Sequence, residues 1–340
     1  MTVVTVSLLP ADAGLLAADL LADRQRRFRN AWPAAAPSFE SQSRCLELLK
    51  PLLREGDAFG AWRGSRLVGF VAGTSHERWG VIPAAGHAVG SGDADTAGVY
   101  GALYAELAKH WVERRVLIHD VELPAVREIE DAWNDLGFGR RVCIGSRSSE
   151  VLPGDAIPGA GTEFRLADID ELSSIVRLAA MEVEFRAGPP MYLKGRPPDL
   201  DLLSETQAEL FGAGAVHFVA SVEREVVGVL TLLQESRFPP ICAEDAPFVS
   251  TTVTDPRYRQ RGIGRMLVRV AADWARERGH EHMDVSFQSA SPLLRSFWRK
   301  AGFVPVGWKV ARRLPESLSK PMGLNAGEFG RPPFRENGAR

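Results

Sequence analysis

The sequence has few cysteines, few lysines, almost no net charge and no long hydrophobic run. Its 340 residues contain three cysteines, Cys45, Cys143 and Cys242, which lie far apart and form no CxxC pair. A disulfide framework, a structural zinc site or any other metal is therefore not expected, and a reduced, cytoplasmic setting fits best. No run of about 18 apolar residues occurs, and no basic segment precedes the first apolar residues, so neither a membrane span nor a secretion signal is expected.

The charges nearly cancel. Lys and Arg number 41 and Asp and Glu number 43, which gives a net charge of −2 and disfavours a nucleic-acid-binding or membrane-binding protein. Hydrophobic residues make up 45% and charged residues 25%, as in ordinary globular chains.

The length predicts two domains, because a typical domain has roughly 150 residues. The segment 148–161, SSEVLPGDAIPGAG, is rich in Pro, Gly and Ser and is the expected linker. It separates a domain at 1–147 from a domain at 162–314, and residues 315–340 form an irregular tail rich in Pro and Gly.

The two halves are predicted to be copies of one fold. Three sets of residues recur in the same order at offsets of 159, 163 and 165. The sets begin at Phe59, Tyr100 and Trp133 and recur from Phe218, Ile263 and Trp298. In the second half the periodicity predicts strands at 215–221, 226–233, 247–254 and 282–287, with helices at 202–211, after 262 and through 298. This alternation indicates an α/β (α+β) class.

The most informative segment is VTDPRYRQRGIGRMLV at 253–268, between a predicted strand and an amphipathic helix. Glycine lets backbone N–H groups approach a ligand, and a helix start offers unpaired N–H groups at the positive end of its dipole. Such a site binds phosphate, and five arginines add positive charge to it. They are Arg257, Arg259, Arg261, Arg265 and Arg269.

Two other nucleotide motifs do not fit this segment. A P-loop needs GxxxxGK[ST], which is absent, and a dinucleotide fingerprint needs a third glycine where Leu267 stands. A nucleic-acid loop would need interleaved aromatic residues and a basic domain. A solvated turn without activity is the remaining alternative.

Arg259-Gln260-Arg261-Gly262-Ile263-Gly264, together with the downstream FWRKAGF at 297–303, resembles the signature of the GCN5-related N-acetyltransferase (GNAT) superfamily. The resemblance implies two tandem GNAT-like domains, each a mixed, mostly antiparallel twisted sheet flanked by helices. It implies acetyl-CoA as co-substrate, no metal, and direct attack by an amine without an enzyme nucleophile.

The resemblance also assigns the cofactor contacts. The loop and helix start would hold the pyrophosphate, the backbone of the preceding strand would meet pantetheine and the thioester carbonyl, and two positions would lie near the sulfur. These residues are Thr252, Val253, Thr254, Arg259, Gln260, Arg261, Gly262, Ile263, Gly264, Arg265, Ser291 and Trp298. Trp298 stands where many family members have a proton-donating Tyr, so water or Tyr192 is the alternative donor, and Ser291 stands where an Asn is common.

The general base is not fixed by the sequence. An alkylammonium must lose a proton before it attacks, and the strand 247–254 carries no carboxylate or His. Candidates elsewhere are Glu182, Glu184, His217, Glu244 and Asp245, beside an ordered water chain. For His217 a structural role in a strand is the alternative.

The first half is predicted to be degenerate. Its matching positions 96–101 lack the arginines and the first glycine, and Asp93 and Asp95 would repel a phosphate. We therefore expect one N-acetyltransferase site, in the C-terminal domain, acting on a primary amine of a small molecule. The alternatives are a mycothiol-synthase-like acetyltransferase and a non-catalytic acyl-CoA-binding module. A monomer or homodimer without nucleic-acid or membrane partners is expected.

Overall fold

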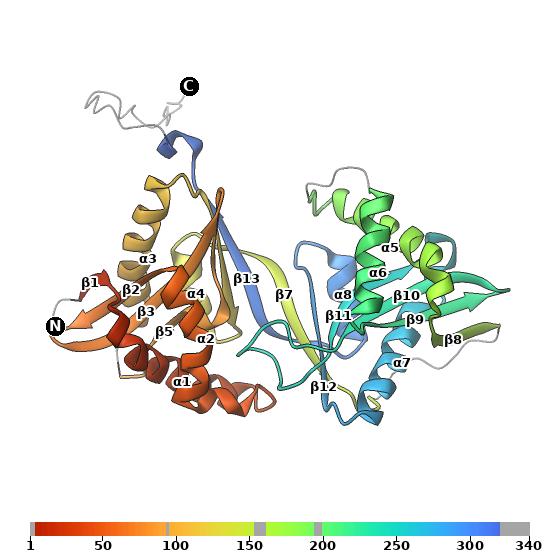
Figure 1. Ribbon diagram of the computed structural model, residues 1–340, viewed down its shortest axis with the longest axis horizontal. Coiled ribbons are helices and arrows are strands. Elements are labelled where there is room, and N and C mark those ends of the chain that lie inside the picture. Colours follow the sequence, from red (N-terminus) through yellow and green to blue (C-terminus); the bar gives the residue numbers. More distant parts are fainter. Residues whose placement is uncertain (1–3, 93–94, 153–160, 194–198, 320–340) are drawn as a thin grey trace, which may run out of the picture.

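The computed structural model describes residues 4–92, 95–152, 161–193 and 199–319. They form two lobes that share one 13-stranded sheet with helices on its faces (Figure 1). The strand order is β1-β2-β3-β4-β6-β13-β7-β12-β11-β10-β9-β8, and β5 pairs with β3 beside this path. The predicted class, mixed α/β with mostly antiparallel strands, is confirmed.

The N-terminal lobe has four helices. They are α1 (Gly14–Ala31), α2 (Gln42–Glu55), α3 (Thr96–Glu113) and α4 (Arg127–Asp135). Its strands are β1 (Thr5–Leu8), β2 (Asp57–Arg63), β3 (Arg66–His76), β4 (Trp79–Ile82), β5 (His87–Val89), β6 (Ile118–Pro124) and β7 (Gly139–Ser148).

The C-terminal half repeats this order. Its helices are α5 (Leu172–Ala187), α6 (Leu200–Gly212), α7 (Ile263–Glu277) and α8 (Pro292–Lys300). Its strands are β8 (Thr162–Leu166), β9 (Val216–Val222), β10 (Glu225–Leu233), β11 (Phe248–Thr254), β12 (His282–Gln288) and β13 (Val304–Arg313).

The two halves exchange their last strands. β13, from the end of the chain, lies between β6 and β7 and pairs with both in antiparallel register. β7, from the first half, pairs with β12 along seven positions, from His282↔Ser148 to Gln288↔Val142. Figure 1 shows β13 in blue among the strands of the N-terminal lobe while β7 runs toward the C-terminal lobe. One sheet therefore crosses the boundary that the sequence places at 148–161, of which residues 153–160 lie outside the described part.

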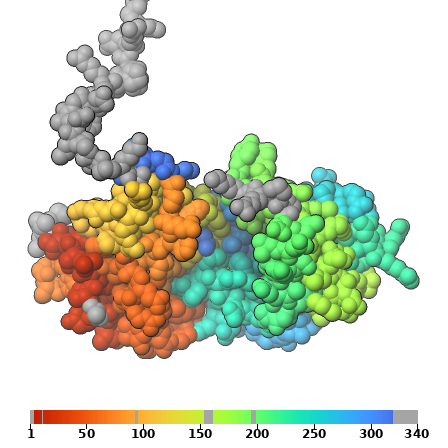
Figure 2. Space-filling view, turned by 45° about the horizontal axis from the view of Figure 1, so that its top comes forward, coloured from red at the N-terminus to blue at the C-terminus, as the bar shows by residue number. Residues whose placement is uncertain are grey.

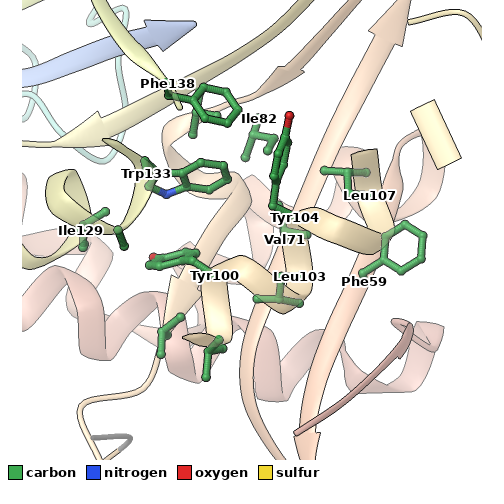
Figure 3. Close-up of a cluster of buried hydrophobic side chains, with 14 of the residues drawn as sticks. Phe59, Val71, Ile82, Tyr100, Leu103, Tyr104, Leu107, Ile129, Trp133 and Phe138 are labelled. Carbon is green, nitrogen blue, oxygen red and sulfur yellow. The ribbon is translucent and has the colours of Figure 1, made fainter. Parts of the chain in front are cut away.

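Each lobe has its own aromatic core. In the N-terminal lobe Tyr100 and Tyr104 of α3 pack against Trp133 of α4, and Tyr104 also packs against Phe138 (Figure 3). The ring centroids of these three pairs are 5.1–5.8 Å apart. In the C-terminal lobe Trp298 of α8 packs against Phe303 at 5.0 Å. Trp133 and Trp298 are a matched pair of the sequence repeat, and both are buried.

A third apolar cluster lies at the junction of the lobes. Phe238 and Ile241, from the segment between β10 and β11, pack on Ile144 of β7, Val306 of β13 and Phe28 of α1. In Figure 2 a teal surface from this part of the chain lies between the orange N-terminal lobe and the green C-terminal helices. The junction is therefore a buried core, which holds the lobes in one arrangement.

Two features are absent from the described residues. No helix among them is long and apolar enough to cross a membrane. No group of three or more His, Cys, Asp or Glu side chains among them is placed to hold a metal ion.

The strand exchange predicts that the second half does not fold alone. A fragment of residues 162–340 lacks β7, so the β12 edge is unpaired, and β13 loses both of its neighbours. We expect this fragment to be insoluble or unfolded by far-ultraviolet circular dichroism, and co-expression with residues 1–161 to restore a soluble complex. A monomeric fragment with a cooperative urea transition would contradict the exchange.

Candidate functional site

The site begins where two parallel strands part. β11 and β12 are paired only at Phe248↔Asp284 and Val249↔Val285. Directly after this point the register between β10 and β11 shifts, so that Ser250 is an extra residue on β11. Such a bulge bends the strand. The remaining parts of β11 and β12 therefore diverge, and the backbone N–H and C=O groups that face the opening do not hydrogen-bond to the other strand.

A cavity of about 1210 Å³ occupies this opening. It is lined by both diverging strands, by the last turns of α5, by the start of α7 and by one face of α8. Ligand pockets commonly measure roughly 300–1,000 Å³. The cavity therefore has room for a long ligand and a second small molecule.

The loop from β11 to α7 is held by a buried carboxylate. Asp255 is 1% exposed and accepts hydrogen bonds from the backbone and guanidinium N–H groups of Arg257, at 2.9–3.1 Å. Arg177 of α5 donates to the same carboxylate at 3.1 Å. These bonds lower the pKa of Asp255 far below its ordinary value, with the Arg257 guanidinium as the main cause. Asp255 thus fixes the loop and ties α5 to it.

The loop ends at an uncapped helix start. Gln260 and Gly262 adopt left-handed conformations, with φ of 64° and 79°, and α7 begins at Ile263. Because the N-cap residue Gly262 has no side chain, it cannot cover the first amides of the helix. A Cβ atom at Gly264 would lie 3.0 Å from Phe297 Cε2, so glycine keeps this surface open. The first residues of α7 therefore line the cavity with no cap side chain over their amides.

The five arginines of this segment do not act together as the sequence predicts. Arg259 and Arg265 line the cavity. Arg257 instead binds Asp255 and Glu225, and Arg269 binds Asp273 at 2.9 Å. Arg261 lies over the ring of Tyr258 at 5.1 Å, outside the cavity wall. Asp255 lies two residues before Arg257 and Asp273 four residues after Arg269, so both carboxylates are also close in the sequence. Which of the five arginines contact a ligand stays a prediction.

Most predicted cofactor residues line the cavity. They are Thr252, Val253, Thr254, Arg259, Gln260, Gly262, Ile263, Gly264, Arg265 and Trp298. Arg261 does not line it, and neither does Ser291, which is buried and accepts a hydrogen bond from Leu294 N at 3.3 Å as the cap of α8. Trp298 is 5% exposed, so it contributes an apolar wall.

Of the predicted base and acid candidates, only Glu182 lines the cavity. Burial raises the pKa of Glu182, while Arg186, with Nη1 3.7 Å from Glu182 Oε1, opposes the rise. A cavity carboxylate with a raised pKa is a stronger proton acceptor than an ordinary glutamate, which suits a general base.

The other candidates lie elsewhere. His217 is buried, stacks on Phe211 with ring centroids 4.0 Å apart and bonds Thr231 Oγ1 through Nδ1 at 3.0 Å. Burial lowers its pKa to about 4, which fits the structural alternative. Tyr192 is 72% exposed, and Glu244, Glu184 and Asp245 are also at the surface; none of these lines the cavity.

Sequence reasoning missed the residues that the strand exchange brings in. Arg141 and Val142 of β7 and Lys309 of β13 line the cavity. No local pattern indicates that a strand before residue 148 forms part of a cavity in the second half. Lys300 of α8 was also missed, although it lies within the FWRKAGF segment.

The corresponding place in the N-terminal lobe is closed. β4 pairs with β6 in parallel, and β5 then departs to pair with β3. His87 of β5 bridges the gap, because its Nε2–H donates to the Glu122 carbonyl at 3.0 Å and its Nδ1 bonds Tyr100 Oη at 3.0 Å. Burial lowers the pKa of His87 to about 3, so the ring is neutral. Tyr100 and Trp133 pack beside it, with ring centroids 5.6 and 5.8 Å from the His87 ring.

The helix start in this lobe is also capped. Asp95 accepts a hydrogen bond from Gly98 N at 2.9 Å, at the first turn of α3. A carboxylate occupies the place where α7 leaves its amides open. That the first half is degenerate stays a prediction, and the Asp95 cap supports it.

Comparisons with known proteins give one family match and one relative in sequence. The model of the acetyltransferase (GNAT) family matches residues 180–303. A streptothricin acetyltransferase from Streptomyces lavendulae is 30% identical over 162 residues, which are 47% of this chain and 82% of the relative.

Solved structures match nearly the whole chain. A GCN5-related N-acetyltransferase from Sphaerobacter thermophilus has a TM-score of 0.60 at 14% identity and covers 91% of this chain and 95% of its own. A tandem GNAT protein from the clavulanic acid biosynthesis pathway has a TM-score of 0.54 at 12% identity and covers 91% and 97%. At these identities the likeness concerns the fold alone, and it includes the tandem arrangement.

The buried carboxylate of Asp255 generates a stability prediction. Asp255→Asn removes the charge that Arg177 and Arg257 bind, so the free energy of unfolding should fall by about 1–3 kcal/mol at pH 7. Because the native pKa is lowered, the charge stabilises above the unfolded value near 4 and this contribution is lost as pH falls through the native value. Urea unfolding should thus show a smaller difference from wild type at pH 3. Glu225→Gln, at an exposed partner of Arg257, is the control and should change stability by less than about 1 kcal/mol; equal effects of the two variants would contradict the assignment.

Proposed function

Because the chain belongs to the acetyltransferase (GNAT) family, we propose that its second half transfers an acetyl group from acetyl-CoA to a primary amine of a small molecule. The observation that carries the proposal is the cavity between the diverging strands, which ends at an uncapped helix start beside two arginines. The first half would serve as structural support.

The residues present fit acetyl-CoA. The amides of Ile263, Gly264 and Arg265 would hold the pyrophosphate, with Arg259 and Arg265 supplying positive charge. In the described part of the chain no carboxylate pairs with either arginine. Backbone groups of β11 from Ser250 to Thr254, left free where β12 departs, would bond the pantetheine arm and the thioester carbonyl.

The reaction would be a direct attack. The amine nitrogen bonds to the thioester carbonyl carbon, the C–S bond breaks, and the nitrogen loses a proton to Glu182. The sulfur leaves as a thiolate, whose conjugate acid has a pKa near 8.5, so a strong protein acid is not required. This chemistry is compatible with Trp298 at the position where the resemblance places a tyrosine.

The acceptor class rests on the curated relative and on the cavity. That relative is named for acetylating streptothricin, a small molecule, and the cavity has room for a small acceptor beside the cofactor. A module that binds acyl-CoA without turnover is the second candidate, since residue 298 is Trp and not the proton-donating Tyr of many family members. It predicts tight binding with no release of thiol.

The cofactor assignment predicts the effect of a bulky charge at the helix start. Gly264→Glu places a carboxylate among the amides of α7 and against Phe297, so titration calorimetry with acetyl-CoA should show at least a 100-fold loss of affinity. Gly101→Glu, at the matched position of α3, is the control, because a Cβ there would make only an ordinary contact with Leu136 Cδ2 at 3.9 Å. Wild-type protein that binds no acyl-CoA, or loss of binding through Gly101→Glu alone, would refute the proposal.

The base assignment predicts a pH effect. Glu182→Gln should lower kcat by about 10²–10⁴-fold and leave the KM for acetyl-CoA nearly unchanged. In wild type, kcat/KM for the acceptor should rise with pH through a pKa above the ordinary glutamate value, since the carboxylate acts when deprotonated. Glu184→Gln is the control on the same helix. An unchanged pH–rate profile in Glu182→Gln would exclude Glu182 as the base.

A further inference from the structure

Two cations from the exchanged strands form one end of the cavity. We call Arg141 of β7 and Lys309 of β13 the junction pair. Both line the same cavity as Glu182 and the diverging strands. Neither belongs to the region 180–303 that the family model matches. Their role is therefore specific to the way in which this chain joins its two halves.

The strand register brings both side chains to one face of the sheet. Lys309 lies opposite Glu122 of β6 and opposite Val142 of β7. The register of β13 with β7 shifts directly after Lys309, so Arg141 is an extra residue that bulges toward the same side. Its carboxylate partner Asp120 is two residues from Glu122 on β6, which places both acids on that face.

The cationic groups are held in place. Lys309 Nζ lies 2.8 Å from Glu122 Oε1 and 4.8 Å from the ring centroid of Phe238. Arg141 Nη2 is bonded to Asp120 Oδ2. Positions fixed in this way before a ligand arrives reduce the entropy lost on binding.

The cations, and not their partners, face the cavity. Lys309 is 29% exposed and Glu122 14%, while Arg141 is 40% exposed and Asp120 16%. Arg141 and Lys309 line the cavity, and the two carboxylates do not. A ligand therefore meets two positive groups at this end, although the four charges sum to zero.

The other cations of the cavity have different positions. Arg259 and Arg265 lie at the helix start, Lys300 is on α8, and Arg186 pairs with Glu182 on α5. The junction pair adjoins Gln288, the register partner of Val142, on the strand arm away from the phosphate loop. It is thus placed for the acceptor, not for the phosphates of the cofactor.

We propose that the acyl acceptor is an amine that also carries a carboxylate, which Arg141 and Lys309 bind while the amine faces Glu182. This inference rests on the proposed acetyltransferase function and deepens it by naming the acceptor class. A carboxylate suits an arginine beside a lysine, because it accepts charge-assisted hydrogen bonds from both. The acceptor would be an amino acid or a small molecule with an amino-acid-like end.

The test compares matched acceptors. The full chain is assayed for thiol release from acetyl-CoA with the common amino acids and with the amines that lack their α-carboxylates. We expect turnover of one or more amino acids with kcat/KM at least 10-fold above that of the decarboxylated partner. Preference for the decarboxylated amines, or no turnover of either class, overturns the inference.

Variants assign the preference to the junction pair. Lys309→Met and Arg141→Met should raise the acceptor KM by about 10- to 100-fold, change kcat less, and leave the KM for acetyl-CoA unchanged. Lys309→Arg should restore most of the affinity. Arg140→Met is the control, since Arg140 lies on the same strand but binds Glu130 and stacks on Trp308 outside the cavity. An equal rise in acceptor KM for Arg140→Met would overturn the assignment.

Calorimetry with acetyl-CoA separates the two proposals. If acetyl-CoA binds and the amino acids are not acetylated, the acceptor inference fails while the cofactor site stands. If acetyl-CoA does not bind, the proposed function itself fails. Circular dichroism shows whether Lys309→Met is folded. A folded variant has lost a ligand contact, whereas an unfolded one shows that the unpaired Glu122 destabilises the junction.

Discussion

The parting of β11 and β12 after only two paired positions is the constraint on which the rest of the site depends. Parallel strands that stayed together would satisfy each other's backbone groups and leave no space between them. The bulge at Ser250 prevents this and leaves the β12-facing side of β11 without a partner strand, while the other side stays paired with β10. The cavity then adjoins both the unpaired edge of β11 and the uncapped start of α7. The N-terminal lobe has the same divergence, but His87 bridges it and Asp95 caps the helix.

The exchanged strands join this site to the other lobe. Because β7 forms the neighbour of β12, the cavity wall is completed by residues that precede the second half in the sequence. The degenerate lobe would therefore act through its strands: it supplies part of the cavity and positions Lys309 against Glu122. The copy with the closed site can be retained in the protein because the shared sheet is complete only with strands from both copies.

Local features were well predicted from the sequence, and pairings between distant segments were not. The predicted start of α7 agrees with the structure, because glycines, arginines and an apolar period of 3.6 residues all coincide there. The strand exchange leaves no local trace, since β7 and β13 have the composition that any strand would have. Five arginines were assigned to the ligand because the prediction counted positive charge, although Asp255, two residues before Arg257, and Asp273, four residues after Arg269, engage two of them.

The central claim is that the space between β11 and β12 holds the thioester arm of acetyl-CoA. A crystal structure of the full chain with CoA tests it most directly. The account predicts the pyrophosphate on the amides of Ile263 to Arg265, the pantetheine arm along Ser250 to Thr254, and the sulfur in the cavity that Glu182 lines. CoA bound in the N-terminal lobe, or outside the opening between the two strands, would contradict it.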